Sequence, residues 1–473
     1  MNRIISRRLF VILLISLMAF MYTTPVLAET NADDTAAPEV TSTEETAAEE
    51  VTAAETSTEE TASESTAVEV TESPSSVSAD NPVQDKFKIS PGYAIKKNHG
   101  LYDIETNKKI ASGVKSFARL EYGILIVKTD NTLRYLYRTG RGQYGEAGAA
   151  GKWKSKKLLS GVKELARGTY AKDYGMSPGG GVKYFVYVVK TNGKLVKATI
   201  KLKSNTAIAS CKWKTIMKNV KHAYISAEGM DGAEDASYYA LKTNGRLYGW
   251  GYNEYGEIGN GKTKKVKESS PHLILKNVKS FTFAGQSYGT STKYGTTCYA
   301  IKRSGDLYSW GINDFLTVQS GAGDAVTKPV KILEDVKCVD GASHTACAVT
   351  NDGVLWNWGT ELGNYTVEGV TVIHYGIGMT PVAKDVSYAD INMFNLFFIK
   401  NNKKLYYIGN GIDGEKYPKT SEPKFVAKNV TAVYTTDVNG RYYLTTKGYL
   451  YGLGFNKGGK YYPKVKLGAG YPK

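Results

Sequence analysis

Histidine and cysteine are scarce in this 473-residue sequence, which has five and four of them. No histidine lies in an HExxH or similar ligand spacing, and no C-x-x-C pair occurs, so the common zinc and dithiol motifs are missing. A glycosidase would need two carboxylates at a set separation in space, which a sequence does not reveal. We expect no metal, no cofactor and a non-enzymatic function.

Long apolar runs are also rare, and the longest lies within the first 28 residues. Three arginines precede the run LFVILLISLMAFM, and Val-Leu-Ala precedes Glu29, which is the pattern of a secretory signal peptide. Residues 6–10 also resemble the start of a twin-arginine signal, but the very apolar run favours general secretion. We expect residues 1–28 to be a signal peptide and the protein to be secreted or extracellular, with cell-surface association as an alternative. We expect no membrane span.

Lysine and arginine are absent from residues 29–85, where Thr, Glu, Ala, Ser, Val and Pro predominate and TSTEETA occurs at 41–47 and 56–62. Such a segment cannot bury enough apolar surface to offset its ordering entropy, so we expect residues 29–88 to be a disordered acidic spacer. Residues 29–85 hold 16 of the 45 acidic residues, whereas 58 of the 61 lysines and arginines lie in residues 86–473. Residues 86–473 therefore carry a net charge of about +29.

This charge has three interpretations, and the sequence leaves them open. It can keep the protein soluble through a lysine-rich surface. It can attract an acidic protein or a polyanion outside the cell, such as an anionic wall polymer or glycan. The acidic spacer can also fold back on the basic part and screen it until a partner competes.

A repeated strand–turn–strand element organises the rest of the chain. Asn-Gly, Ser-Gly, Asp-Gly or Lys-Gly joins most of the paired strands and provides the φ > 0 positions of a hairpin turn. The mean period is about 50 residues, which is in the range of propellers and solenoids. The leucine that follows each turn is found at Leu101, Leu133, Leu195, Leu247, Leu307, Leu355, Leu405 and Leu450.

Two further segments recur between these hairpins. Seven copies share the pattern of SGVKSFA (112–118) and are interpreted as the first strand of each unit. A last element often starts with proline, as in PHLIL (271–275) and PKVKL (463–467), which suits the first residue of an edge strand. We predict an all-β fold over 89–473, a β-propeller of four-stranded blades. Seven blades are favoured, with eight as the alternative, because the first hairpin (93–110) lacks its own inner strand.

One unit carries a family resemblance. The stretch LYGWGYNEYGEIGNG (247–261) resembles the signature of the regulator of chromosome condensation repeat, with Glu257 where the family usually has glutamine. The match decays in the other units. The resemblance implies a propeller and, as in secreted bacterial members such as a β-lactamase inhibitory protein, binding of a protein through loops on one face. Since no helix is expected after these glycines, we interpret them as shaping a connector, with Asn253 bonded to backbone, and not as a phosphate loop.

Aromatic residues that do not recur between units are the best candidates for binding. Tyr248 and Tyr308 occupy one repeat position, which indicates packing within the blades. Rigid rings in the loops after the third strand, next to lysines, suit a protein or glycan interface. The predicted partner-binding residues are Tyr144, Tyr252, Tyr255, Phe315, Phe455, Lys262, Lys264 and Lys265.

Cys338 and Cys347 flank the turn GASH (341–344). If that turn is symmetric, they lie opposite each other on neighbouring strands, and export would allow a cross-strand disulfide. The alternative is that both are small buried hydrophobic residues.

The function predicted from these features is binding. We predict a secreted, monomeric propeller that binds an extracellular protein through loops on one face. The alternative is a cell-surface polyanion or carbohydrate binder driven by the basic charge. We expect no nucleic-acid partner.

Overall fold

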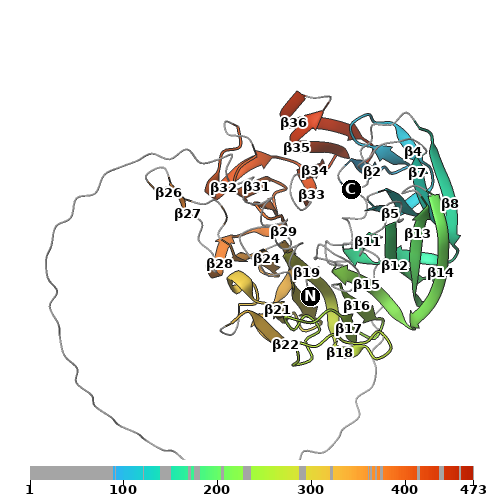
Figure 1. Ribbon diagram of the computed structural model, residues 1–473. Coiled ribbons are helices and arrows are strands. Elements are labelled where there is room, and N and C mark those ends of the chain that lie inside the picture. The colour runs from blue at the N-terminus through green and yellow to red at the C-terminus, as the bar shows by residue number, and fades with distance from the viewer. Residues whose placement is uncertain are drawn as a thin grey trace, which may run out of the picture. The chain divides into compact units, whose positions relative to one another are not determined.

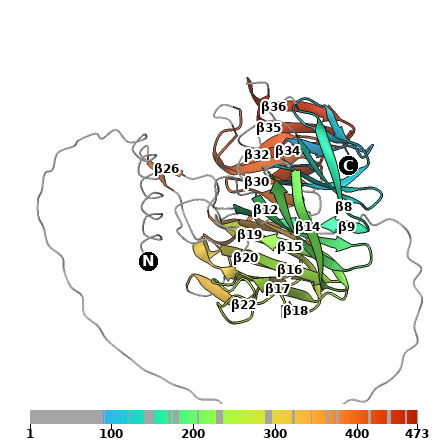
Figure 2. The ribbon, with the colours of Figure 1, turned by 45° about the vertical axis from the view of Figure 1, so that its right-hand side comes forward.

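The computed structural model describes residues 89–471. It leaves out positions 91, 121, 139–150, 169–171, 175–181, 204–206, 227–235, 287–294, 320–322, 343, 361, 363–364, 368–369, 373–376, 413–415, 436–440 and 458–459. The described strands form eight antiparallel blade sheets arranged in a ring (Figures 1 and 2). Within these residues, no helix combines the length and apolar character needed to cross a membrane.

The strands of blades 1 to 4 follow the chain from the inside of the ring outward, with one exception in blade 3. Blade 1 contains β1 (Ile89–Ser90), β2 (Tyr93–Ile95), β3 (Leu101–Asp103) and β4 (Lys109–Ala111), and blade 2 contains β5 (Val114–Leu120), β6 (Gly123–Lys128), β7 (Leu133–Arg138) and β8 (Trp153–Leu159). Blade 3 contains β9 (Val162–Leu165), β11 (Lys172–Tyr174), β12 (Val182–Lys190), β13 (Leu195–Lys203) and β14 (Ala207–Met217). Blade 4 contains β15 (Val220–Ser226), β16 (Ser237–Lys242), β17 (Leu247–Gly251) and β18 (His272–Leu275), joined by β10 (Arg167–Gly168), which pairs in parallel with β15.

The remaining blades repeat this order. Blade 5 contains β19 (Val278–Gln286), β20 (Gly295–Lys302), β21 (Leu307–Ile312) and β22 (Ala325–Leu333), with the 3-10 helix η3 (Asp314–Leu316) after β21. Blade 6 contains β23 (Val336–Ala342), β24 (Thr345–Thr350), β25 (Leu355–Gly359) and β28 (Ile377–Ala383), and a separate hairpin of β26 (Tyr365–Val367) and β27 (Val370–Val372) is inserted before β28. Blade 7 contains β29 (Val386–Ile391), β30 (Asn395–Lys400), β31 (Leu405–Gly409) and β32 (Thr420–Ala427), and blade 8 contains β33 (Val430–Thr435), β34 (Arg441–Thr445), β35 (Tyr449–Lys457) and β36 (Lys460–Ala469).

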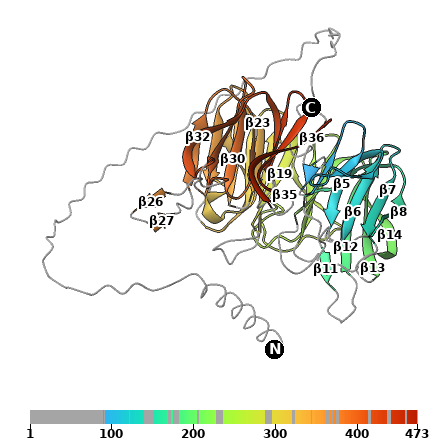
Figure 3. The same ribbon diagram turned by 90° about the horizontal axis from the view of Figure 1, so that it is seen from above.

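The antiparallel order gives the ring two faces. The turns between second and third strands and the connections from one blade to the next lie on one face, which we call the turn face. The first–second and third–fourth connections lie on the other face, which we call the loop face. The side view in Figure 3 shows β5 to β8 side by side, so that their ends reach these two faces.

Backbone hydrogen bonds tie each blade to the next at the turn face. The N–H that opens an inner strand donates to a carbonyl in the turn of the preceding blade, as from Val114 to His99 (2.6 Å) and from Val278 to Gly245 (2.8 Å). The turn also donates to the residue before its own inner strand, as from Thr129 to Gly113 (2.8 Å). The repeated glycines and asparagines of these turns are therefore needed for φ > 0 at the joints between blades.

The C-terminal residues close the ring by completing this pattern in blade 1. Tyr471 N–H donates to Gly448 O in the turn of blade 8 (3.3 Å), and Lys97 N–H in the turn of blade 1 donates to Gly470 O (2.7 Å). Gly470, with φ of 83°, thus takes the place that Gly113, with φ of 62°, has in blade 2. The start of the inner strand of blade 1 comes from the C-terminus, and its later part is β1.

This composite strand corrects the favoured blade count. The first hairpin, predicted to close a seven-bladed ring or to start an eighth blade, forms a four-stranded sheet of its own with β1 and β4. Blade 1 packs on blade 8 through Ile89, Ala94 and Tyr471 and on blade 2 through Ile95 and Leu101. The described residues therefore form eight blades, the alternative that the sequence left open.

The predicted position of proline was wrong for most of the outer strands. Pro329, Pro381, Pro423 and Pro463 lie within β22, β28, β32 and β36, and only Pro271 directly precedes its strand, β18. These strands are fourth strands and pair on one side only. An edge strand can hold proline in its interior because half of its N–H groups have no ladder partner.

Buried aspartates link the inner strands of blades 6, 7 and 8. Asp340 accepts a hydrogen bond from the N–H of Ile391 (3.3 Å), and Asp390 accepts one from the N–H of Thr435 (3.1 Å). Asp340 and Asp390 occupy the same position of the repeat, four residues after the valine that opens each strand. Buried carboxylates need such donors, so these two residues have a structural role between blades.

Candidate binding surface

The connector from Gly251 to Val266 on the loop face is held by one asparagine. Asn253 is 1% exposed; its Nδ2 donates to the carbonyls of Lys262 (2.8 Å) and Lys264 (3.1 Å), and its Oδ1 accepts from the N–H of Ile258 (2.8 Å). Gly251, Gly256, Gly259 and Gly261 have φ between 64° and 104°. The prediction of a glycine-shaped connector with Asn253 bonded to backbone is confirmed.

The aromatic residues predicted to bind a partner on this face pack largely against neighbouring groups. Tyr255 lies over Gly295, where an added Cβ would be 2.9 Å from its ring. Phe315, at the same repeat position one blade on, packs edge to face on His344 with ring centroids 4.6 Å apart. Tyr252 donates to Glu254 within its own connector. These half-buried rings fill joints between loops.

The other predicted binding residues are dispersed. Lys262, Lys264 and Lys265 are exposed on the connector. Phe455 belongs to β35, but its side chain lies outside the description, and Tyr144 lies outside the described residues. Among the described ones, the three lysines share the Gly251–Val266 connector with Tyr252 and Tyr255, and Phe315 lies in η3.

Glu257 occupies a fully buried position in this connector, with 0% of its surface exposed. Its carboxylate accepts the N–H of Tyr255 (3.0 Å), while Oε1 has no partner among the described residues. Burial raises the pKa of the Glu257 carboxyl to about 7. The folded protein therefore keeps this proton to a higher pH than the unfolded chain does.

We expect Glu257→Gln to raise the free energy of unfolding by about 3 kcal/mol at about pH 8. The wild type should lose this stability as the pH rises from 4.5 to about 7, because the unfolded chain releases the proton first. In denaturant titrations over the same pH range, the free energy of unfolding of Glu257→Gln should change little. Glu254→Gln, at an exposed position, is the control and should keep the wild-type pH profile. Equal pH profiles for Glu257→Gln and the wild type would contradict the assignment.

The possible disulfide between Cys338 and Cys347 is not formed. Cys338 pairs with Val349 and Cys347 with Asp340, because the turn has two residues where four were expected. Both cysteines are free and buried in the core between blades. Burial raises the pKa of the Cys338 thiol to about 11, so the alternative of small buried hydrophobic residues holds.

The described residues were compared with metal sites and with the nucleophile elbow of hydrolases. No group of three or more His, Cys, Asp or Glu side chains among them is placed to hold a metal ion. The sequence matches G-x-S-x-G at 175–179 and 285–289, but the elements flanking each match are antiparallel strands, β11 and β12 or β19 and β20. A nucleophile elbow needs a strand-to-helix turn.

The turn face is strongly basic. Its eight second-to-third-strand turns carry 13 lysines or arginines and three acidic residues, and every basic one is half-buried or exposed. Several lysine stems pack on tyrosine rings of the same blade, as Lys302 does on Tyr308 (4.3 Å from Nζ to the ring centroid) and Lys242 on Tyr248 (5.1 Å). This packing holds the ammonium groups at the rim of the face. The 13 basic residues are Lys96, Lys97, Lys128, Lys190, Lys194, Lys242, Arg246, Lys302, Arg303, Lys400, Lys403, Lys404 and Lys447.

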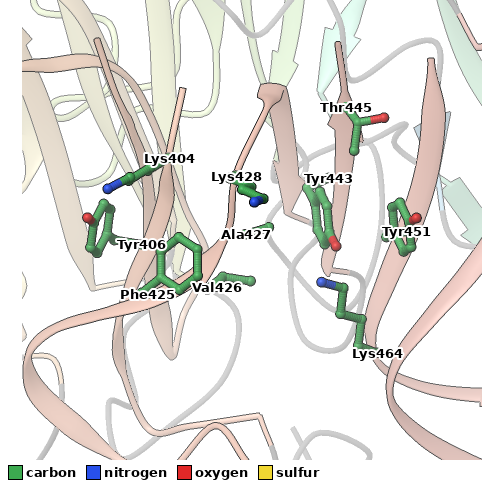
Figure 4. Close-up of a pocket in the computed structure, with 10 residues that line it drawn as sticks. All are labelled: Lys404, Tyr406, Phe425, Val426, Ala427, Lys428, Tyr443, Thr445, Tyr451 and Lys464. Carbon is green, nitrogen blue, oxygen red and sulfur yellow. The ribbon is translucent and has the colours of Figure 1, made fainter. Parts of the chain in front are cut away.

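A groove of about 750 Å³ lies between blades 7 and 8 and extends to the turn face (Figure 4). Tyr406 and Phe425 form one wall, with ring centroids 5.8 Å apart. Tyr443 and Tyr451 form the other, stacked at 5.0 Å with an interplanar angle of 7°. Phe425 is 53% exposed, so the wall formed by Tyr406 and Phe425 offers apolar surface to a ligand.

Three lysines line the same groove. Lys404 comes from a turn, Lys428 from the connection between blades 7 and 8, and Lys464 from β36. Among the described residues, none of the three forms an ion pair with a carboxylate. Burial, together with the positive charge of Lys416, lowers the pKa of Lys464, whose Nζ lies 5.3 Å from the ring centroid of Tyr443. A carboxylate bound beside Lys464 would offset both the desolvation of its ammonium group and the repulsion from Lys416.

One position of the repeat marks this groove in the sequence. Tyr443 stands two residues before Thr445. Four of the other repeats have alanine there, before the strand-ending Lys or Thr, and the remaining three have Ile126, Val188 and Phe398. A large ring in place of a repeated alanine marks a blade whose packing differs from that of its neighbours. Phe425 and Lys464 lie on outer strands, and the sequence does not predict how these strands pair with the third strand of their blade.

Comparisons with known proteins identify one repeat family and several similar chains. Residues 244–288 match the family described as the Regulator of chromosome condensation (RCC1) repeat. The chain is 31% identical over 134 residues to the E3 ubiquitin-protein ligase HERC2 of Homo sapiens, across 26% of this chain and 3% of that protein. It is 29% identical over 136 residues to the Ultraviolet-B receptor UVR8 of Arabidopsis thaliana, across 27% and 28%. Human WBSCR16 is a similar solved structure, with 14% identity, a TM-score of 0.44, and coverage of 69% of this chain and 86% of that one.

The matched part of the chain spans less than a third of the length of either curated relative. The activities in their names are therefore those of HERC2 and UVR8. The segment that matches the repeat model begins in the turn before β17 and ends just after β19. The same segment holds the Asn253-centred connector. The chain is a β-propeller that carries a Regulator of chromosome condensation (RCC1) repeat at residues 244–288.

Proposed function

We propose that this protein is a non-enzymatic binding propeller that engages an acidic region of a partner protein. The groove between blades 7 and 8 carries the proposal, because it combines aromatic walls with three lysines that lack carboxylate partners in the described chain. The basic turns around it extend the complementary surface. The proposal places this function outside the cell, on the basis of the signal-like sequence of residues 1–28.

The chemistry of the groove suits a peptide with carboxylates flanking an apolar or aromatic group. An exposed ring such as Phe425 can cover an apolar side chain, which is how most binding energy is gained at protein interfaces. Lys428 and Lys464 can pair with carboxylates on either side. The turn face then adds long-range attraction, which mainly raises the association rate.

A polyanion or carbohydrate is the second candidate, favoured by the net charge of about +29 on residues 86–473. Binding of that kind depends on many phosphate, sulfate or carboxylate contacts. It should weaken steeply with salt and should not require the aromatic walls.

Affinity capture from extracellular proteins, with the protein as bait, tests the proposal. We expect a partner that survives about 500 mM NaCl and is reduced about tenfold or more by Phe425→Ser. Leu316→Ser is the matched control, since Leu316 is the other large hydrophobic residue exposed in the described chain, at 41%, and lies on the loop face. Loss of all binding at high salt would favour the polyanion. Equal loss of binding with Phe425→Ser and Leu316→Ser would count against a binding site in the groove.

A further inference from the structure

We propose that the acidic segment 29–85 of this same chain occupies the groove and the turn face in cis, so that an acidic partner must displace it. The inference goes beyond the proposed function, since it concerns occupancy before any partner binds. It rests on the direction of β1, on the position of blade 1 beside blade 8, and on charge. The occupant is a segment of this chain that lies outside the described residues.

The direction of β1 brings the chain in from the turn face. β2 runs toward the turn at 96–100, and β1 is antiparallel to it, with Ile89 opposite Ala94 and Ser90 opposite Tyr93. Ile89 is therefore the end of β1 nearer the turn face. The N-terminal end of β1 therefore points toward the face that carries the basic turns.

β1 also lies next to the blade that forms one wall of the groove. Ile89 packs in one cluster with Tyr434, Tyr442 and Tyr471, and two of these belong to blade 8. Tyr443, the neighbour of Tyr442 in β34, faces the groove. The point where the acidic segment joins the propeller is thus separated from the groove by a single blade.

The segment is long enough to reach the groove. The first Glu-Glu pair of its TSTEETA repeats, Glu44 and Glu45, is 44 residues before Ile89. A flexible chain of this length has an end-to-end distance of about 35 Å. Tethering at such a distance gives an effective concentration of about a millimolar.

Charge complementarity favours the acidic segment 29–85 as the occupant of the groove and the turn face. The segment has 16 acidic and no basic residues, and the turns of the opposing face have 13 basic and three acidic ones. Each exposed ion pair is worth only about 0.2–1 kcal/mol and is screened by salt. Many weak pairs under tethering give an occupant that is bound at low salt and can still be displaced.

A labelled peptide of residues 38–66 tests the inference on chains that begin at residue 29. One chain is wild type, and the other has every Asp and Glu of 29–85 replaced by Asn or Gln. At about 50 mM NaCl, we expect the peptide to bind the neutralised chain about tenfold or more tightly than the wild type, whose site is filled in cis. The difference should vanish at about 500 mM NaCl.

Charge reversal then locates the site. In the neutralised chain, Lys404→Glu, Lys428→Glu and Lys464→Glu together should weaken the peptide about tenfold or more. Lys262→Glu, Lys264→Glu and Lys265→Glu together, on the loop face, should change the affinity less than about twofold.

Two results would overturn the inference, and they can be told apart from failure of the proposed function. Equal peptide affinity for the wild-type and neutralised chains would show that the cis segment does not occupy the site. No peptide binding to either chain would do the same. If a poly-glutamate peptide nevertheless binds the neutralised chain through the three groove lysines, the proposed function stands and only the cis occupancy fails.

Discussion

A chain that ends at Ala469 should unfold at a markedly lower denaturant concentration than the full chain, with a loss of about 3–5 kcal/mol. The deletion removes Tyr471, which is 0% exposed and packs between blades 8 and 1. It also removes the hydrogen bonds from Tyr471 to Gly448 and from Lys97 to Gly470. Since these bonds close the ring, we expect a larger hydrodynamic radius as well.

Two matched variants separate ring closure from a general effect of truncation. A chain that ends at Tyr471 keeps both hydrogen bonds and should have wild-type stability. Tyr471→Phe should be neutral or slightly stabilising, because the hydroxyl is buried without a partner in the described chain. If the chain that ends at Ala469 is as stable as the wild type, the C-terminus does not close the propeller.

The repeat could be predicted well because its signals are local. Valines that open inner strands, Gly or Asn at the turns and the recurring leucines are all read within one unit of about 50 residues. The structure has inner strands at the seven predicted segments, such as β5 and β19. Hydrophobic alternation and turn chemistry were enough for this level of the fold.

The blade count depended on a contact between the two ends of the propeller. Tyr471 stands in the place of an inner-strand valine, and the sequence Gly470-Tyr471 resembles Gly113-Val114 only in the glycine. Because the inner strand of blade 1 is assembled from both ends of the chain, no continuous stretch of sequence contains its hydrophobic pattern. The register at Cys338 and Cys347 escaped prediction for a similar reason, since turn length shifts pairing by whole residues.

The groove between blades 7 and 8 lies apart from the described residues that the sequence predicts to bind a partner. The predicted binding rings in the loops are not all unique to one unit, since Tyr255 and Phe315 share a repeat position and cover the next blade. The groove instead uses strand residues such as Tyr406 of blade 7 and Tyr443 of blade 8, brought together across two blades. Their proximity depends on the relative placement of blades 7 and 8, which no single unit encodes.

Charge reversal in the groove should produce the largest effect on binding. Lys404, Lys428 and Lys464 face one cavity and have no carboxylate partners in the described chain. Replacing all three by glutamate changes the local charge by six units and places repulsive groups beside the ligand. We expect an acidic peptide to lose about a hundredfold in affinity at low salt. Lys262, Lys264 and Lys265 provide an equal change of charge on the loop face.

The most direct measurement is the affinity of a labelled poly-glutamate peptide for three proteins: the chain with the acids of residues 29–85 neutralised, and the same chain carrying either triple substitution. At about 50 mM NaCl, the groove triple should lose about a hundredfold and the loop triple less than about twofold. Such a result would place the acidic ligand at the groove between blades 7 and 8. Equal losses for the two triples would mean that net charge alone attracts the ligand, and would contradict a binding site in the groove.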